Sequence, residues 1–236
     1  MIIRHDRSDR ESLVNAHQWP GITSFFRGRG GASLIAPTWL LTAAHVAKSI
    51  PAEIRLSVEI AEKRYTIVRT VFHPNYDHTW IQGGEDDGNN TVDLALIELE
   101  APVENVSPFD LYKDHDEQGQ EVLLLGQGEF GNGIRGTRGS DRALRQVTNK
   151  IDEVDSWWLK FRFDAPPGGT FLEGVCGRGD SGSPAFIQRN HRFLIAGVSS
   201  WQMVGNRSLG NYGCIEHYTR VSSFIDWIQA TCGLLS

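Results

Sequence analysis

The segment Gly179–Pro184 reads Gly-Asp-Ser-Gly-Ser-Pro, and it decides how the rest of the chain is interpreted. It places Ser181 between small residues, in a turn where the serine's own backbone N–H can help to bind an anion. Upstream lie Leu41–His45, which reads Leu-Thr-Ala-Ala-His, and Thr91–Leu96, which reads Thr-Val-Asp-Leu-Ala-Leu. In the order His, Asp, Ser, the three segments supply a general base, an orienting carboxylate and a nucleophile.

Each of the three residues meets a chemical requirement of acyl transfer. The hydroxyl of Ser181 is too weak an acid to ionise near neutrality, so an imidazole must take its proton, and His45 is the candidate. The imidazole in turn needs a buried carboxylate, and Asp93 fits because it opens an apolar strand. A lone histidine is ordinarily structural, as we expect for His73, but the three motifs together predict a catalytic triad.

The bulk composition narrows the classes of function. A chain of 236 residues with 40% hydrophobic and 22% charged residues is ordinary for a soluble globular protein. The formal net charge of −6 argues against general nucleic-acid binding, and no apolar run is long enough to span a membrane. The acidic run Glu85–Asp87 lacks the spaced ligands of a calcium loop and is expected to be solvated. We therefore expect no metal, no cofactor, no nucleic acid and no membrane as partners, and a monomer.

The hydrophobic pattern predicts an all-β protein. Short apolar or alternating runs are bounded by turn residues, with no helical periodicity between them. A hairpin should turn at Pro37, a short helical turn should contain His45, and residues 222–231 should form a C-terminal helix with Ser222 or Ser223 as N-cap. The segment 82–90 is expected to be an enlarged loop. The expected strands are 33–36, 39–42, 53–60, 65–72, 94–99, 121–126, 157–163, 183–188 and 192–200.

From about Pro20 to the C-terminal helix, these motifs resemble the trypsin-like serine proteases of the chymotrypsin fold. The resemblance implies two six-stranded antiparallel Greek-key barrels, one in residues 1–113 with His45 and Asp93, the other in 114–236 with Ser181 and the helix. It also implies a serine endopeptidase that cleaves a peptide or protein substrate through an acyl-enzyme on Ser181. The backbone N–H groups of Gly179 and Ser181 would form the oxyanion hole.

The same resemblance implies a specificity pocket between three segments. In the family, arginine- and lysine-cleaving members carry an aspartate where this chain has Gly174 or Val175. Glu216 could enter from the opposite wall and favour Arg or Lys weakly; alternatively it is exposed and the pocket accepts apolar residues. Gln202, where glycine is common, should narrow the mouth, and Ser200 should help to hold Asp93. The candidate substrate-binding residues are Gly174, Val175, Cys176, Arg178, Ser200, Trp201, Gln202 and Glu216.

Three cysteines leave the compartment open. Cys176 and Cys214 fall near a family disulfide that joins the pocket walls, which would imply an oxidising compartment; the alternative is two reduced, buried thiols. Cys232 is expected to be an unpaired packing residue. So few cysteines suggest a bacterial member. The N-terminus lacks the apolar core of a secretory signal, so a cytoplasmic chain stays possible beside a secreted or periplasmic one.

The segment Gly179–Pro184 also contains Asp180. In the trypsin-like family, the aspartate at this position pairs with an N-terminal ammonium that activation cleavage frees. We expect the amine of Ile2 to take this role, with an internal cation such as Arg178 as the alternative. Other functions remain open beside an active endopeptidase: a zymogen that needs N-terminal activation, an esterase, and a catalytically silent binding module. The intact triad argues against the last, and labelling of Ser181 would decide.

Overall fold

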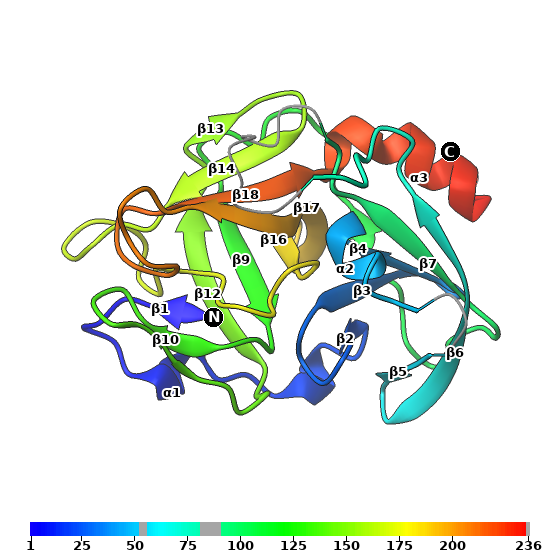
Figure 1. Cartoon of the computed structure of the whole chain (residues 1–236), viewed down its shortest axis with the longest axis horizontal. Helices are drawn as coiled ribbons and strands as arrows, with labels where there is room; N and C mark the ends of the chain where they lie inside the picture. Colours follow the sequence, from blue (N-terminus) through cyan, green and yellow to red (C-terminus); the bar gives the residue numbers. More distant parts are fainter. Residues whose placement is uncertain (52–55, 81–90, 235–236) are drawn as a thin grey trace.

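Two groups of short apolar runs form two barrel-like β-sheets that lie side by side (Figure 1). The computed structural model describes residues 1–51, 56–80 and 91–234. The predicted all-β fold of the trypsin type, ending in a helix, is confirmed. The predicted loop 82–90, the acidic run Glu85–Asp87 and the first part of the strand predicted over 53–60 lie outside the described residues.

The N-terminal sheet carries six strands in the order β2-β3-β4-β7-β6-β5. The β3–β4 hairpin turns at Pro37 as predicted, and all residues of both its strands are buried. A short helix, α2 (Ala44–Ala47), follows β4 directly. The strands are β2 (Ile22–Ser24), β3 (Gly31–Ala36), β4 (Trp39–Thr42), β5 (Ser57–Ile60), β6 (Lys63–Phe72) and β7 (Ala95–Leu99).

The C-terminal half holds an eight-stranded sheet and a four-stranded one, so its strand number differs from the six expected. The eight strands are β8 (Asp110–Leu111), β9 (Glu121–Gly126), β12 (Arg145–Lys150), β13 (Glu153–Val154), β14 (Trp158–Arg162), β16 (Pro184–Arg189), β17 (Arg192–Met203) and β18 (Ile215–Arg220). The four strands are β1 (Ile2–Ile3), β10 (Phe130–Asn132), β11 (Gly136–Gly139) and β15 (Gly174–Val175).

The first residues of the chain lie in this C-terminal half. Strand β1 pairs in parallel with β10 and antiparallel with β15, so that Ile2 faces Val175 and Ile3 faces Gly174. A four-residue helix, α1 (Asp9–Ser12), and a 3₁₀ turn, η1 (Ala16–Gln18), then lead back toward the N-terminal sheet. The division expected at residue 113 therefore does not describe β1, which belongs with strands from the other half of the chain.

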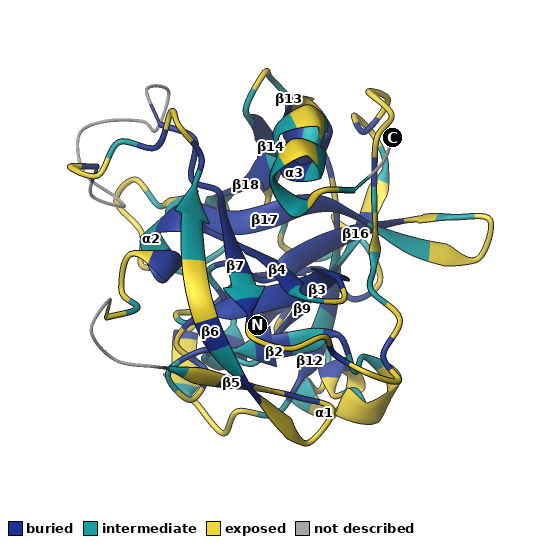
Figure 2. Cartoon of the chain, turned by 90° about the vertical axis from the view of Figure 1, so that its right-hand side faces the viewer, coloured by how far each residue is buried: buried dark blue, intermediate teal, exposed yellow. Residues whose placement is uncertain are grey.

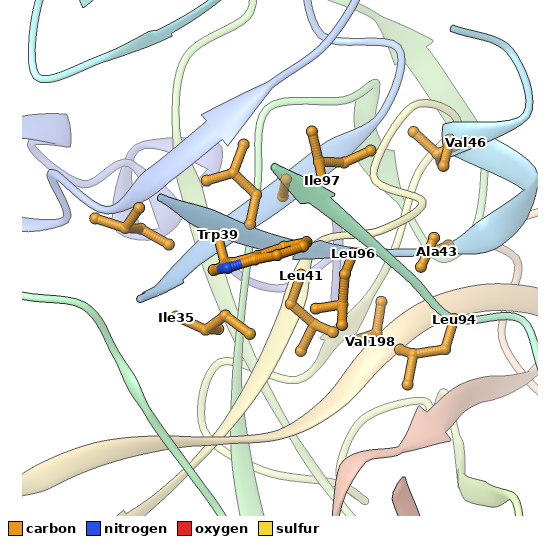
Figure 3. Close-up of a cluster of buried hydrophobic side chains, with 14 of the residues drawn as sticks. Ile35, Trp39, Leu41, Ala43, Val46, Leu94, Leu96, Ile97 and Val198 are labelled. Atoms are coloured by element: carbon orange, nitrogen blue, oxygen red, sulfur yellow. The ribbon is translucent and has the colours of Figure 1, made fainter. Parts of the chain in front are cut away.

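The largest hydrophobic core extends from the N-terminal sheet to the C-terminal one. Figure 3 shows Trp39, Leu41 and Leu96 of the N-terminal sheet beside Val198 of β17, and Figure 2 shows the central strands as mostly buried. Ala43 and Leu94 belong to the same core and lie two residues before His45 and directly after Asp93. Close packing of such a core resists displacement, so it fixes the backbone from which these two side chains project.

The chain ends in helix α3 (Ile225–Cys232), but its beginning differs from the prediction. A 3₁₀ turn, η2 (Val221–Phe224), contains both Ser222 and Ser223, and the N-cap position falls on Phe224 without a side-chain cap. The ring of His73 lies edge-on to Phe224 and Trp227, with both centroids 4.9 Å away, which joins the helix to the N-terminal half. Within the described ranges, no helix has the length and apolarity needed to span a bilayer.

Candidate active site

His45 and Asp93 meet at the junction of the two sheets. Helix α2 presents His45, and Asp93 lies in the extended segment that leads into β7. The ring Nδ1 of His45 lies 2.6 Å from Oδ2 of Asp93, and the backbone N–H of His45 donates to Oδ1 at 2.8 Å. Two contacts to one carboxylate fix both the tautomer and the orientation of the ring, as a general base requires.

Asp93 is fully buried and held from the C-terminal half as well. The hydroxyl of Ser200 donates to Oδ2 at 2.5 Å, and that of Thr219 donates to the backbone carbonyl of Asp93 at 2.9 Å. Burial alone would raise the pKa of Asp93, but the charge of His45 and the hydrogen bonds from His45 and Ser200 outweigh it and lower the pKa below its ordinary value. The carboxylate is therefore ionised at neutral pH.

A bulge in β17 aims Ser200 at Asp93. The pairing of β17 with β18 shifts between Ser199, which faces Tyr218, and Trp201, which faces His217, so Ser200 is the extra residue. Such a bulge redirects one side chain without ending the strand. The expected contact between Ser200 and Asp93 is thus built by an irregularity of register.

Ser181 lies half-buried in the same cleft as His45. Its loop is held by β17, because Gly182 N–H donates to the Ser199 carbonyl at 2.8 Å and Ser199 N–H donates to the Ser183 carbonyl at 2.9 Å. Among the hydrogen bonds of the described residues, none joins the Ser181 hydroxyl to the His45 ring. Catalytic hydrogen bonds are often long in unliganded sites and tighten with substrate.

The loop before Ser181 can bind an anion. Gly179 has φ +90°, and a Cβ there would lie 2.4 Å from the Gly28 carbonyl oxygen, so the position requires glycine. The backbone N–H groups of Gly179 and Ser181 donate to no partner in the described part of the chain. They are therefore available for a developing negative charge.

The buried carboxylate of Asp180 organises this loop through three contacts. Gly177 N–H donates to Oδ2 at 2.8 Å and Gly128 N–H to Oδ1 at 2.7 Å. The ammonium group of Met1 lies 2.8 Å from Oδ2, with both groups fully buried. The expected partner was the amine of Ile2 or an internal cation such as Arg178; in the structure the ammonium that pairs with Asp180 is that of Met1, and the nitrogen of Ile2 is a peptide amide.

A pocket of about 250 Å³ opens on the other side of Ser181. The described residues that line it are Cys176, Gly177, Arg178, Gly179, Ser181, Ser199, Ser200, Trp201, Gln202, Leu209 and Glu216. We call it the Glu216 pocket. Two expected members, Gly174 and Val175, are not among these lining residues; they form β15 and pair with β1.

Glu216 is a buried wall residue, only 1% exposed, which contradicts the alternative of an exposed side chain. Its Oε1 accepts from the backbone N–H of Cys176 at 2.7 Å and from Nε2 of Gln202 at 2.5 Å. Gln202 thus lies across the carboxyl group. Burial raises the pKa of Glu216 to about 8, against the opposing effect of these two hydrogen bonds.

Cys176 and Cys214 are free thiols, so the expected disulfide is absent from the structure and the alternative of reduced cysteines holds. The Sγ of Cys176 lies 2.8 Å from the Tyr218 hydroxyl, while Cys214 packs in a different hydrophobic cluster. Burial raises the pKa of both thiols, to about 12 for Cys214. Cys232 is half-buried and unpaired, as expected for a packing residue.

Three aromatic residues near the pocket escaped the sequence analysis. The ring of His217 stacks on Trp201 with centroids 3.7 Å apart, and Trp158 lies edge-on to both. Burial lowers the pKa of His217 to about 4, so its ring is neutral at neutral pH. Trp80 lies edge-on to the His45 ring, with the two ring centroids 6.3 Å apart. No local pattern in the sequence points to these contacts, since they join distant segments.

The described residues contain no group of three or more His, Cys, Asp or Glu side chains arranged to hold a metal ion.

The family model described as Trypsin matches residues 10–228. The complement C1s subcomponent of Rattus norvegicus is 28% identical over 244 residues, which cover 90% of this chain and 33% of the relative. Ovochymase of Halocynthia roretzi is 26% identical over 225 residues, covering 86% of this chain and 13% of the relative. The calcium-dependent serine proteinase of Mesocricetus auratus is 29% identical over 233 residues, covering 86% and 32%.

This chain spans a third or less of the length of these three relatives. All three are animal proteins, so they give no support to the bacterial member that the few cysteines suggested.

Proposed function

The chain belongs to the trypsin family of serine endopeptidases, and we propose that Ser181 is its nucleophile, His45 its general base and Asp93 the carboxylate that orients His45. The observation that carries the proposal is the double contact of Asp93 with the ring and the backbone of His45, in the cleft that also contains Ser181. The substrate is a protein or peptide, as the family implies.

In the proposed reaction, the Ser181 oxygen attacks the carbonyl carbon of the peptide bond while Nε2 of His45 takes the hydroxyl proton. The carbonyl oxygen becomes an anion and accepts hydrogen bonds from the N–H groups of Gly179 and Ser181. His45 then gives the proton to the leaving amine, which leaves an acyl group on Ser181. Water, deprotonated by His45, attacks that ester and restores the free serine.

We also propose a preference for arginine or lysine before the cleaved bond. Glu216 lines the pocket, and its Oε2 accepts no hydrogen bond from the described residues. A guanidinium or ammonium group that enters the pocket would stabilise the ionised form of Glu216 and lower its pKa from about 8. Charge pairing in a desolvated pocket favours such a side chain over an apolar one of similar size.

The contact between Asp180 and the terminal ammonium supports an active arrangement of the oxyanion loop. Asp180 directly precedes Ser181 and accepts from Gly177 and Gly128, so its charge holds the segment that carries the anion-binding N–H groups. We propose that an ammonium at this position keeps the site competent. A buried carboxylate without its cation would be destabilised by roughly 3–5 kcal/mol.

Labelling with a fluorophosphonate tests the proposal. An active nucleophile should form one covalent adduct, located at Ser181 by peptide mass analysis, with loss of peptidase activity. Ser181→Ala should lose the adduct and on the order of 10⁶ in turnover. Ser140→Ala, an exposed serine that lines the same cleft, serves as the matched control and should keep the adduct. An unlabelled wild type would favour a zymogen or a silent binding module instead.

We also propose where the protein is located and in which oligomeric state it occurs. Relatives named as complement subcomponents support a secreted or periplasmic protein over a cytoplasmic one. A disulfide between Cys176 and Cys214 would have been a separate argument for an oxidising compartment. Because both are free thiols, that argument does not apply. We keep a monomer as the expected state, to be checked by sedimentation.

A further inference from the structure

A second hollow, of about 730 Å³, adjoins Ser181 on the side away from the Glu216 pocket. His45 and Ser181 form one end of it. Four arginines line it, Arg27, Arg29, Arg142 and Arg178, and among the described lining residues Glu129 is the one carboxylate. We call this hollow the arginine cleft. The concentration of positive charge is unexpected in a chain whose formal net charge is −6.

The four guanidinium groups have no ion-pair partner among the described residues. The acid closest in sequence to Arg142 is Asp141, but its carboxylate is occupied by Arg145 at 2.7 Å. Arg145 also binds Asp9 at 2.9 Å, so that buried arginine is neutralised twice. Glu129, the one carboxylate among the described lining residues, forms no ion pair with the four arginines, so the cleft keeps an excess of positive charge that can act on a ligand that enters.

The backbone that carries Arg27 is held in an unusual conformation. Phe26 and Arg27 have φ +47° and +62°, and Gly28 N–H donates to the Phe25 carbonyl at 3.0 Å to close the turn. Left-handed φ values are uncommon for such side chains and persist only where surrounding structure enforces them. The turn therefore presents Arg27 from a fixed backbone, with the Arg29 N–H also donating to the Phe25 carbonyl, at 3.1 Å.

Arg142 is tied to the same turn. Its φ is +62°, and a Cβ added to Gly28 would lie 3.3 Å from its Cγ, so its aliphatic stem covers Gly28. Gly28 in turn packs on the oxyanion loop, since a Cβ on Gly179 would lie 2.4 Å from the Gly28 carbonyl oxygen. Arg142 therefore packs on Gly28, and Gly28 packs on the loop whose N–H groups would bind the reacting carbonyl oxygen.

The position of the cleft decides which part of a substrate reaches it. The Glu216 pocket and the strand Ser200–Gln202 would hold the residues before the cleaved bond. Arg178, Gly179 and Ser181 line both hollows, so a chain that continues past Ser181 enters the arginine cleft with its leaving-group side. An extended chain advances about 3.3 Å per residue, so three residues span about 10 Å.

We propose that the arginine cleft selects acidic side chains in the first three residues after the cleaved bond. The inference rests on the proposed endopeptidase function and names the substrate class of that same site. Carboxylates on the leaving-group side would pair with Arg27 and Arg142, and guanidinium groups bind carboxylates through two parallel N–H donors. A free polyanion would be attracted by the same charge, but the contact of the cleft with Ser181 and Gly179 favours the substrate itself.

A set of internally quenched peptides tests the proposal on the unaltered protein. All peptides carry arginine before the cleaved bond and differ only in the next three residues, which are Asp, Asn or Lys at each place in turn. We expect kcat/KM to be about tenfold higher for the best aspartate peptide than for its asparagine twin, and lower still for lysine. Equal values for Asp, Asn and Lys at all three places would overturn the inference.

The double variant Arg27→Gln/Arg142→Gln assigns the selectivity to the cleft. The ratio of kcat/KM for the aspartate peptide to that for its asparagine twin should fall about fivefold, because an exposed pair contributes up to about this factor. Since each ratio is taken within one protein preparation, a partly folded variant does not distort it. Arg10→Gln, at an exposed arginine of α1 outside the cleft, is the matched control and should keep the wild-type ratio.

A short arginine substrate with a chromogenic leaving group separates the two levels of the argument. If it is not cleaved, and Ser181 takes no fluorophosphonate, the endopeptidase proposal fails and the inference falls with it. If it is cleaved while the double variant and wild type discriminate charge equally, the proposed function stands and the arginine cleft is rejected as the cause.

Discussion

The two hollows that adjoin Ser181 differ in the sign of their charged side chains and in how far those side chains are buried. The Glu216 pocket is about 250 Å³ and places one carboxyl group in its wall, buried and already hydrogen-bonded to Gln202 and Cys176. The arginine cleft is about 730 Å³ and exposes four guanidinium groups without carboxylate partners among the described residues. A buried acid has a shifted pKa and little screening by salt, whereas exposed arginines keep their charge and are screened.

The contrast means that Ser181, the proposed nucleophile, is flanked by two hollows that would select substrates electrostatically in different ways. The Glu216 pocket should discriminate strongly between substrate side chains, and this selectivity should depend on pH. The reason is that burial raises the pKa of Glu216 to about 8, so its charge changes near neutral pH. The cleft should discriminate weakly, independently of pH near neutrality, and should depend on ionic strength. Four measurements test whether the two hollows differ in this way.

Blocking the N-terminal ammonium should have the largest effect on turnover. The ammonium pairs with Asp180, which lies in the loop that lines both hollows. Acetylation of Met1, or two added residues before it, leaves Asp180 without its cation and loosens the loop that carries Gly179. We expect kcat/KM to fall by about 10²–10³-fold for every substrate. The measurement is hydrolysis of the short arginine substrate, with the same extension at the C-terminus as the control; undiminished turnover rejects this role of the ammonium.

Glu216→Gln should come next and should affect the pocket alone. The ratio of kcat/KM for an arginine peptide to that for a leucine peptide should fall on the order of 10²-fold, because a desolvated charge loses its partner. The Asp-to-Asn ratio on the leaving-group side should not change. Glu121→Gln, at an exposed glutamate of β9, is the control. Retained arginine selectivity would reject Glu216 as the specificity determinant.

The pH dependence of stability should follow Glu216 as well. Its pKa is raised by burial from 4.5 to about 8, so the folded state holds the proton more tightly than the unfolded state does. The stabilisation is complete below pH 4.5 and is lost as the pH rises through about 8. Thermal unfolding between pH 4.5 and 9 should show the wild type losing Tm relative to Glu216→Gln, by on the order of 10 °C. A constant difference in Tm over this range contradicts the shifted pKa.

Ionic strength should produce the smallest effect and should act on the cleft. Raising the salt from about 0.05 M to 1 M shortens the screening length from over 10 Å to about 3 Å. The Asp-to-Asn preference after the cleaved bond should shrink a few-fold, while the Arg-to-Leu preference before it changes less. Measuring both ratios in the same buffers supplies the internal control. A parallel decline of the two would mean that the hollows do not differ in exposure as described.

The sequence predicted the structural features that are encoded in local motifs. Runs of buried aliphatic residues such as those of β3, β4 and β7 have enough length for their pattern to be read, and the segments around His45 and Ser181 combine several matching neighbours. The position of Asp93 followed because an aspartate directly before an apolar strand is carried inward with it.

The sequence could not predict features that depend on pairing between distant segments. Strand β1 has two residues and no periodicity, so nothing local shows that it pairs with Gly174 and Val175. Gln202 of β17 hydrogen-bonds to Glu216 of β18, and Trp201 of β17 stacks on His217 of β18, whose pKa is lowered by burial. The arginines of the cleft come from three separate loops and form a group only in the folded chain.

The unpaired cysteines have a practical consequence for handling the protein. Cys176, Cys214 and Cys232 hold no covalent cross-link, so nothing in the folded chain has to be oxidised for the pocket walls to meet. Production in a reducing bacterial host, without a refolding step, should yield native material, and millimolar dithiothreitol in storage buffers should leave turnover intact. Alkylating reagents should likewise reach Cys176 only after unfolding, which makes its modification a convenient clock for the loss of native structure.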